Sequence, residues 1–131
     1  MTTVLLVDDQ FELRAIHGTY LREHGFQVLT AGDGDSALAT ARSQTPDIIL
    51  LDHSLPRRTG LDVAKELRSD PRTADIPIVM ITAHTYGAVG HKARAVGCVS
   101  FLAKPCPPSR VLQEVLRFTS NGTSTEAASA S

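Results

Sequence analysis

Five short apolar runs, separated by longer segments of helical periodicity, constrain the fold of this chain more than any other feature. The runs lie at about residues 4–7, 26–31, 48–52, 78–82 and 99–103. Short runs rich in branched apolar residues are typical of parallel strands that are buried on both faces. Their alternation with helical segments predicts five consecutive βα units, and hence an α/β fold built on a five-stranded parallel sheet.

Two of the helical segments carry clear start or stop signals. In the first, Leu13, Ile16 and Tyr20 predict one apolar stripe, and Gly25 ends the helix. The segment Thr59-Gly60-Leu61-Asp62 has the form of a capping box, in which a hydroxyl and a carboxylate each bond a backbone amide at a helix start. We therefore expect a helix to begin near Gly60.

The C-terminal part of the chain contains two more helices and a tail. The segment at about 86–96 includes Gly87 and Gly90, which weaken a helix and predict a loosely held start. The last helix opens after Pro107-Pro108-Ser109. Residues 119–131 are small and polar, so we expect a disordered tail after a single domain.

Composition excludes several classes of function. Thirteen basic and fourteen acidic residues give a net charge of −1, which offers no general attraction to nucleic acid or to an anionic membrane. No apolar run is long enough to span a bilayer, and neither Cys98 nor Cys106 has metal-ligand spacing. We expect a cytoplasmic protein, with His17, His24 and His91 at its surface.

Polar side chains follow four of the five predicted strands. Asp8 and Asp9 follow the first, Asp52 the third, Thr82 the fourth and Lys104 the fifth. Because the carboxyl ends of parallel strands meet at one edge, where open α/β folds bind ligands, these groups are predicted to converge there. Three carboxylates together repel one another, and a hard cation such as Mg²⁺ or Mn²⁺ relieves that repulsion. Lys104 and Thr82 add an ammonium and a hydroxyl suited to a phosphoryl group.

Each of these residues also has a simpler interpretation when it is taken alone. Asp9 and Glu12 have the spacing of a helix-capping pair, and Thr82 could cap a helix or turn. Lys104 would be a surface ammonium, and Phe101 would be part of the core. Their joint placement at strand ends favours the functional interpretation.

In this arrangement the chain resembles the receiver domain of bacterial two-component response regulators. The matching motifs are Val7-Asp8-Asp9, Asp52 with Pro56 and Gly60, Thr82-Ala83, and Phe101 with Lys104-Pro105. The resemblance implies a doubly wound, flavodoxin-like three-layer sandwich with strand order 2-1-3-4-5, over residues 1–118. It implies a phospho-switch rather than an enzyme with a substrate to turn over.

The resemblance also implies a role for each matching residue. Asp52 is the phosphoacceptor, Asp9 a direct magnesium ligand and Asp8 a ligand mainly through water. The backbone carbonyl of Ser54 is a further metal ligand, and Lys104 is the partner of the phosphate.

Thr82 and Phe101 form the switch pair of the resembled family, and the Lys104–Pro105 peptide bond is cis. The expected phosphodonor is a sensor histidine kinase or a histidine phosphotransfer protein. The downstream target is a protein that the sequence does not identify, and we expect no direct contact with nucleic acid. The receiver is expected to be a monomer or a weak dimer.

Several positions depart from the resembled pattern. His53, Ser54 and His84 surround the site and are candidates for tuning the rate of dephosphorylation. Arg57-Arg58 fills a loop that is often neutral or acidic in relatives, and Cys106 stands where many relatives have an aromatic or aliphatic residue.

Three rival functions are weighed against the phospho-switch. A haloacid-dehalogenase phosphatase needs a second Asp two residues past its nucleophile, and this chain has Ser54 there. A flavodoxin-like nucleotide binder needs a Gly-rich phosphate loop after the first strand, which this chain lacks. The remaining alternative is a receiver-like interaction module that acts without phosphorylation.

Overall fold

The computed structural model of the chain describes residues 1–83 and 88–119. Strands and helices alternate along it without exception. The strands are β1 (Thr3–Val7), β2 (Gln27–Ala31), β3 (Ile48–Asp52), β4 (Ile78–Thr82) and β5 (Ser100–Ala103). The helices are α1 (Phe11–Glu23), α2 (Gly34–Gln44), α3 (Gly60–Ser69), α4 (Ala88–Ala95) and α5 (Pro108–Arg117). Each predicted strand agrees with an observed one to within one residue at either end.

The five strands form one parallel sheet in the order β2-β1-β3-β4-β5, which confirms the predicted topology. At its centre, Leu5 of β1 pairs with Leu29 of β2 on one side and with Ile49 of β3 on the other. Every residue of β3 and β4 is buried. This explains why both strands appear in the sequence as unbroken apolar runs rather than as an alternation.

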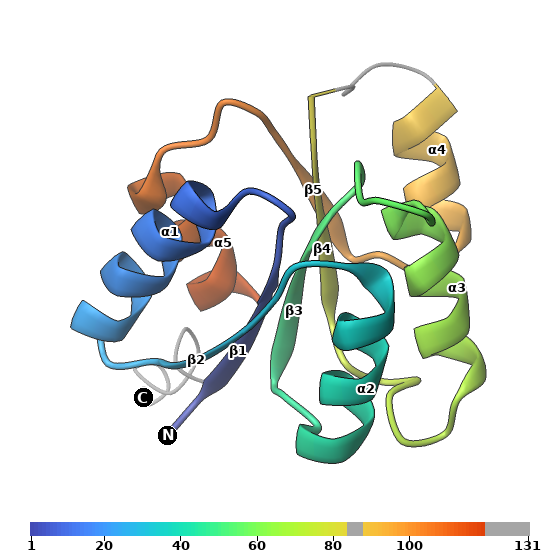
Figure 1. Cartoon of the computed structure of the whole chain (residues 1–131), viewed down its shortest axis with the longest axis horizontal. Coiled ribbons are helices and arrows are strands. Elements are labelled where there is room, and N and C mark those ends of the chain that lie inside the picture. Colours follow the sequence, from blue (N-terminus) through green and yellow to red (C-terminus); the bar gives the residue numbers. More distant parts are fainter. Residues whose placement is uncertain (84–87, 120–131) are drawn as a thin grey trace.

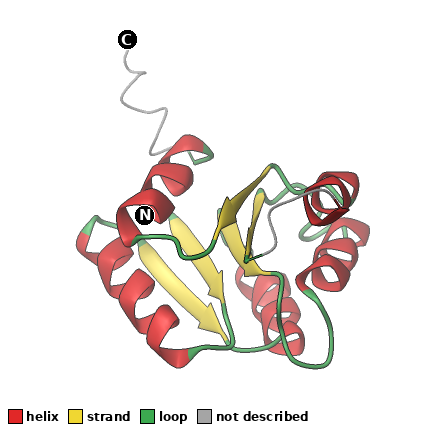
Figure 2. Cartoon of the chain, turned by 90° about the horizontal axis from the view of Figure 1, so that it is seen from above, coloured by secondary structure: helices red, strands yellow, loops and turns green. Residues whose placement is uncertain are grey.

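Helices cover both faces of the sheet, so the molecule has three layers (Figures 1 and 2). Helices α1 and α5 pack together on one face, and α2, α3 and α4 pack on the other. One apolar cluster lies on each side of the sheet, the first including Leu51 and Leu67 and the second including Leu50 and Val115. None of the helices among the described residues is long and apolar enough to cross a membrane.

The phase of α1 differs from the prediction. Its buried residues are His17, Gly18 and Leu21, whereas Ile16 of the predicted stripe is 52% exposed. This side of the helix lies against the sheet, and a Cβ on Gly18 would meet Val28 of β2 at 3.7 Å, an ordinary van der Waals distance. The predicted surface position of His17 is therefore wrong. The helix does end where expected, just before Gly25, which has a positive φ of 92°.

The predicted start of α3 is confirmed. The Thr59 hydroxyl accepts a hydrogen bond from the Asp62 amide at 3.2 Å, and the Asp62 carboxylate accepts one from the Thr59 amide at 3.4 Å. Gly60 is the first helical residue, and its amide donates to the His53 carbonyl at 2.8 Å. The capping box thus fixes the start of α3, and the Gly60 amide joins that start to the segment that follows β3.

Two expectations for the C-terminal part extend beyond the described residues. The predicted loose start of the fourth helix lies at residues 84–87, which the structure does not describe, and α4 begins at Ala88. The proposed tail is likewise outside the description from residue 120 onward, while Thr119, its first residue, is buried. The last helix begins at Pro108, two residues before the start expected after Ser109, and the proline occupies the first helical position.

Candidate functional site

The predicted residues meet at the carboxyl edge of the sheet. Asp8 follows the last residue of β1, Asp52 ends β3, Thr82 ends β4, and Lys104 follows the last residue of β5. The parallel direction of the strands accounts for this, since residues far apart in sequence reach one edge when their strands run the same way.

Three carboxylates form the acidic part of the site. One oxygen from each of Asp8, Asp9 and Asp52 lies within 4.8 Å of the others. Asp8 and Asp52 are only 5% and 2% exposed, whereas Asp9 is exposed. Two such charges about 4 Å apart repel by on the order of 4 kcal/mol at an effective dielectric constant near 20. An all-oxygen cluster that is open on the Asp9 side fits a hard divalent cation that keeps part of its water shell.

Asp9 does not cap α1, so the alternative interpretation of Asp9 and Glu12 is wrong. The N-cap residue is Gln10, and its side chain makes no capping hydrogen bond. Instead, the Gln10 amide donates to Asp8 Oδ1 at 2.9 Å, and Arg14 Nη1 donates to the Asp8 carbonyl at 2.6 Å. These two bonds fix the turn from β1 into α1, and Arg14 is a contributor that the sequence analysis did not identify.

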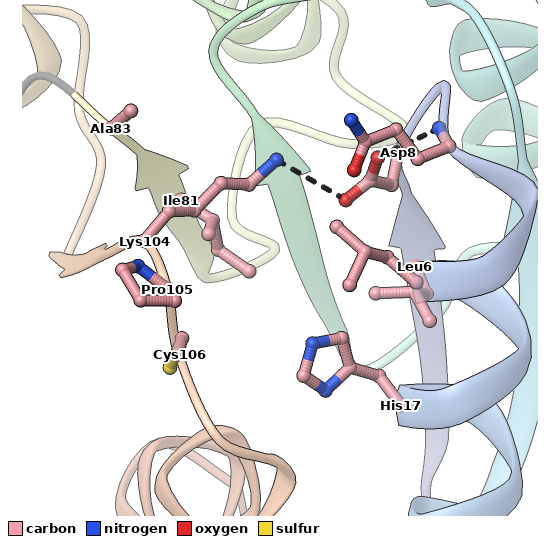
Figure 3. A pocket seen from close by; sticks show the side chains of 10 residues that line it. Leu6, Asp8, His17, Ile81, Ala83, Lys104, Pro105 and Cys106 are labelled. Atoms are coloured by element: carbon pink, nitrogen blue, oxygen red, sulfur yellow. Dashed lines mark hydrogen bonds and ion pairs between the residues drawn. The ribbon is translucent and has the colours of Figure 1, made fainter.

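Lys104 neutralises part of the acidic cluster. Its Nζ lies 3.1 Å from Asp52 Oδ2 and 3.5 Å from Asp8 Oδ2, and Figure 3 shows the side chain reaching across to Asp8. Burial alone would lower the pKa of Lys104, but the hydrogen bond and charge of Asp52, followed by those of Asp8, raise it above its ordinary value. Lys104 therefore stays charged at neutral pH. The Lys104–Pro105 peptide bond is cis, as expected.

Asp52 has the environment of a poorly solvated carboxylate. Burial raises its pKa, and the nearby charge of Asp8 acts in the same direction. The Ser54 amide, which donates to Asp52 Oδ1 at 3.1 Å, and the Lys104 ammonium oppose that rise. One oxygen of Asp52 is thus held by the Ser54 amide and the other by Lys104.

The expected switch residues lie on neighbouring strands. Thr82 is buried at the end of β4, while Phe101 is half-buried on β5, where it pairs with Met80. The Phe101 ring packs against α4, with its Cζ 3.2 Å from where a Cβ on Gly90 would lie. Gly90, which weakens the helix by its propensity, therefore has a packing reason to be present. Arg94 of α4 lies over the same ring, 5.5 Å from its centroid.

Three residues were expected to tune the rate of dephosphorylation, and the structure places them differently. Ser54 is at the site through its amide. His53 is half-buried, and its Nδ1 has no hydrogen-bond partner among the described residues. His84 lies outside the described residues, so its proposed place at the mouth of the site stays a prediction.

His17 is a residue near the site that the sequence analysis assigned to the surface. It is 7% exposed and lines a pocket together with Asp8 and Lys104 (Figure 3). Burial lowers its pKa, an effect that Lys104 reinforces and Asp8 opposes. The sequence signal that could have predicted this burial is the spacing of four residues between His17 and Leu21, which places both on one face of the helix.

The comparisons with known proteins agree with this geometry. The family model of the response regulator receiver domain matches residues 4–116. The chain therefore belongs to the response regulator receiver family, and its function is that of a phosphorelay receiver domain.

The relatives of this chain include two transcriptional regulatory proteins. The phosphate regulon transcriptional regulatory protein PhoB of Pseudomonas aeruginosa is 36% identical in an alignment over 127 residues that covers 93% of this chain and 55% of that protein. The probable transcriptional regulatory protein TcrX of Mycobacterium tuberculosis is 46% identical over 81 residues, which are 62% of this chain and 34% of that protein. The chain thus spans about half the length of these relatives or less.

Among solved structures, the chemotaxis response regulator CheY4 of Vibrio cholerae has the same architecture. Its TM-score to this chain is 0.86 at 34% sequence identity, and the match covers 90% of this chain and 98% of that one.

Proposed function

We propose that Asp52 is the residue that accepts the phosphoryl group, in a reaction assisted by Lys104, Thr82 and a divalent cation. The donor is a phosphohistidine on a sensor kinase or a histidine phosphotransfer protein. The observation that carries the proposal is the pairing of a buried strand-end carboxylate, 2% exposed, with an ammonium 3.1 Å away.

The acidic cluster fits Mg²⁺ or Mn²⁺ by the chemistry of its donors, which are all oxygens. Asp9 and Asp52 would hold the ion directly, Asp8 mainly through water, and the Ser54 carbonyl would complete the protein's share. When bound, the ion supplies positive charge that offsets the charge of the transferring phosphoryl oxygens.

The residues of the chain perform the rest of the reaction by positioning and charge. An Asp52 oxygen forms a bond to phosphorus while the phosphorus–nitrogen bond of the donor breaks, and the electron pair of that bond stays on the donor imidazole. Lys104, already within reach of Asp52 and Asp8, pairs with the phosphoryl oxygens. Hydrolysis of the acyl phosphate by water returns the carboxylate.

The new phosphate brings about −1.5 to −2 charges to the end of β3. The Thr82 hydroxyl, at the end of the neighbouring strand, turns to donate to a phosphoryl oxygen. Phe101 then follows into the space that Thr82 leaves, which changes its packing against Gly90 and Arg94 of α4. A partner that contacts α4 and β5 would sense that change.

Mass spectrometry after treatment with acetyl phosphate and Mg²⁺ tests the acceptor. We expect the parent protein to gain one acid-labile phosphate and Asp52→Asn to gain none, because the amide lacks a nucleophilic carboxylate. Asp75→Asn is the matched control, since Asp75 is exposed in the turn before β4, at the opposite end of the sheet. Undiminished phosphate on Asp52→Asn would refute the assignment. A parent that takes up no phosphate would favour an interaction module that acts without phosphorylation.

A further inference from the structure

A pocket of about 370 Å³ lies beside the phosphorylation site, between α1 and the segment that follows β5 (Figure 3). Much of its wall is apolar and comes from Leu6, Leu13, Ile81 and Pro105. Proteins hold organic ligands in pockets of roughly 300–1,000 Å³ that are mainly apolar and contain a few polar groups. This pocket is at the small end of that range, so its size suits a small molecule.

The His17 imidazole lines the pocket on its α1 side, and its unpaired nitrogen lies on a ring edge that is closed to solvent. The side chain projects from α1 toward the segment that carries Cys106 (Figure 3), and its Nδ1 is buried with no hydrogen-bond partner among the described residues. Leaving a buried polar atom unpaired costs free energy. A half-turn of the ring exchanges its two edges, so a polar group inside the pocket can give the imidazole the bond that it lacks.

The charges around the pocket indicate that the ligand is neutral. Asp8 and Lys104 are charged, and they already form an ion pair at 3.5 Å. Burial raises the pKa of the Cys106 thiol, which keeps it uncharged at neutral pH. An anionic ligand would therefore lose its hydration without finding a free counter-charge among the described lining residues. The divalent cation proposed for the acidic cluster would repel a cationic ligand.

We propose that this pocket binds a small uncharged molecule with a mainly apolar body and one hydrogen-bonding group directed at His17. Asp8 and Lys104 belong both to the wall of the pocket and to the phosphorylation site. Occupancy of the pocket therefore changes the rate at which Asp52 is phosphorylated. The effect on rate rests on the proposed function, whereas the binding does not.

Amide chemical shifts measured by NMR during a titration test the binding. Indole is the probe, because it is uncharged, mainly apolar and carries one N–H donor. Indene has nearly the same shape without that donor and is the matched control. We expect indole to give saturable shifts at residues of the pocket and to bind about three- to tenfold more tightly than indene, the difference that one hydrogen bond makes. The absence of saturable shifts with indole would overturn the proposal.

Two variants locate the site. Cys106→Phe places a large ring in the pocket and should abolish the indole shifts, while the remaining spectrum shows that the fold persists. His17→Leu keeps a similar volume without a polar atom and should bring the affinity for indole close to that for indene. Indole binding that is unchanged in Cys106→Phe would place the ligand elsewhere and overturn the proposal, whether or not His17→Leu folds.

The initial rate of Asp52 phosphorylation by acetyl phosphate tests the second consequence. Indole should alter this rate in the parent and leave it unaltered in Cys106→Phe. Binding of indole without any change of rate would overturn the regulatory part alone. A parent that is not phosphorylated even without indole would instead contradict the proposed function, and the NMR titration would still decide whether the pocket binds.

Discussion

At the scale of single residues, the site depends on close approaches that admit little change. Gly60 is the clearest case, because a Cβ at this position would lie 2.4 Å from the Asp52 carbonyl oxygen and 3.0 Å from the sulfur of Met80. The start of α3 can therefore approach the end of β3 only when residue 60 has no side chain. The contacted oxygen belongs to the backbone of Asp52, the proposed phosphoacceptor.

We predict that Gly60→Ala lowers the free energy of unfolding by about 1–3 kcal/mol, since backbone atoms must move to relieve the overlap. The shift displaces Asp52 and should also slow its phosphorylation. Gly18→Ala is the matched control: a Cβ there meets the nearest atom, Arg22 Nη1, at 3.4 Å, so stability should stay equal or rise. Urea unfolding and phosphorylation rates of both variants provide the measurement. Equal stability of Gly60→Ala and the parent would show that the contact is relieved without cost.

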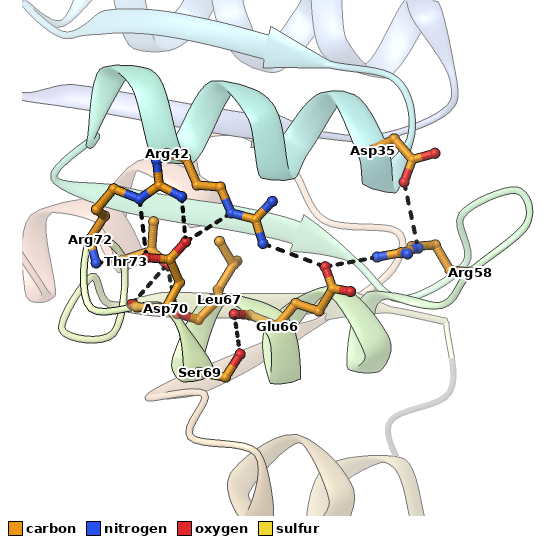
Figure 4. Close-up of polar contacts among 9 residues, drawn as sticks. All are labelled: Asp35, Arg42, Arg58, Glu66, Leu67, Ser69, Asp70, Arg72 and Thr73. Atoms are coloured by element: carbon orange, nitrogen blue, oxygen red, sulfur yellow. Dashed lines mark hydrogen bonds and ion pairs between the residues drawn. The ribbon is translucent and has the colours of Figure 1, made fainter.

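At the scale of elements, a chain of ion pairs joins α2 to α3 (Figure 4). Arg42 of α2 lies 3.0 Å from Asp70 and 3.7 Å from Glu66, and Arg58 reaches both Glu66 and Asp35. Exposed pairs of this kind contribute little individually, about 0–1 kcal/mol. Asp70 differs because its carboxylate is only 13% exposed and has several donors at once.

We predict that Asp70→Asn is less stable than the parent at neutral pH and that this difference shrinks as the pH falls below about 4. Hydrogen bonds from the Arg72 side chain and amide, with a further one from Arg42, lower the pKa of Asp70 to about 2. A carboxyl whose pKa is lower in the folded than in the unfolded state stabilises the fold above its unfolded pKa, near 3.8. That stabilisation is lost as the pH falls from about 4 to 2.

Urea unfolding at pH 7, 4 and 2.5 measures the effect, with Asp75→Asn as the control for loss of an exposed carboxylate. A difference between Asp70→Asn and the parent that stays constant over this range would contradict the assigned ion pairs.

The elements also show what the sequence could and could not predict. Strand positions were predictable because β3 and β4 are buried on both faces, and the start of α3 was predictable because the capping box of Thr59 and Asp62 is local. The side of α1 that faces the sheet was not predictable. The packing of α1 against β2 places His17 and Gly18 on the buried side of the helix, and this packing joins segments that no local pattern connects.

The candidate site also has a part that local sequence patterns predict and a part that depends on packing between distant segments. The convergence of Asp8, Asp52 and Lys104 was predictable, because strand direction alone brings strand ends to one edge. Arg14, which bonds the Asp8 carbonyl, and the pocket beside His17 were not predictable, because both depend on how α1 is rotated against the sheet.

At the scale of the whole molecule, the carboxyl edge of the sheet concentrates negative charge that folding alone does not neutralise. Lys104 supplies one positive charge, bonded to Asp52 and Asp8, against three carboxylates. Asp9 has no hydrogen bond or ion pair within the described residues, and it is exposed. The fold thus retains an electrostatic penalty at the site, and a bound cation would relieve it.

We predict that Mg²⁺ stabilises the whole fold and that Asp9→Asn removes most of this effect. A ligand that binds only the folded state at about 100 times its dissociation constant adds about 2.7 kcal/mol to the free energy of unfolding. Thermal unfolding of the parent should therefore shift upward with MgCl₂, and less so with NaCl at equal ionic strength. Asp9→Asn should raise the stability without Mg²⁺, because it removes one of three repelling charges, and should lose most of the response to the ion. Glu12→Gln is the matched control, since Glu12 is exposed in the first turn of α1 and is not part of the acidic cluster. A full response to Mg²⁺ in Asp9→Asn would place the cation away from this cluster.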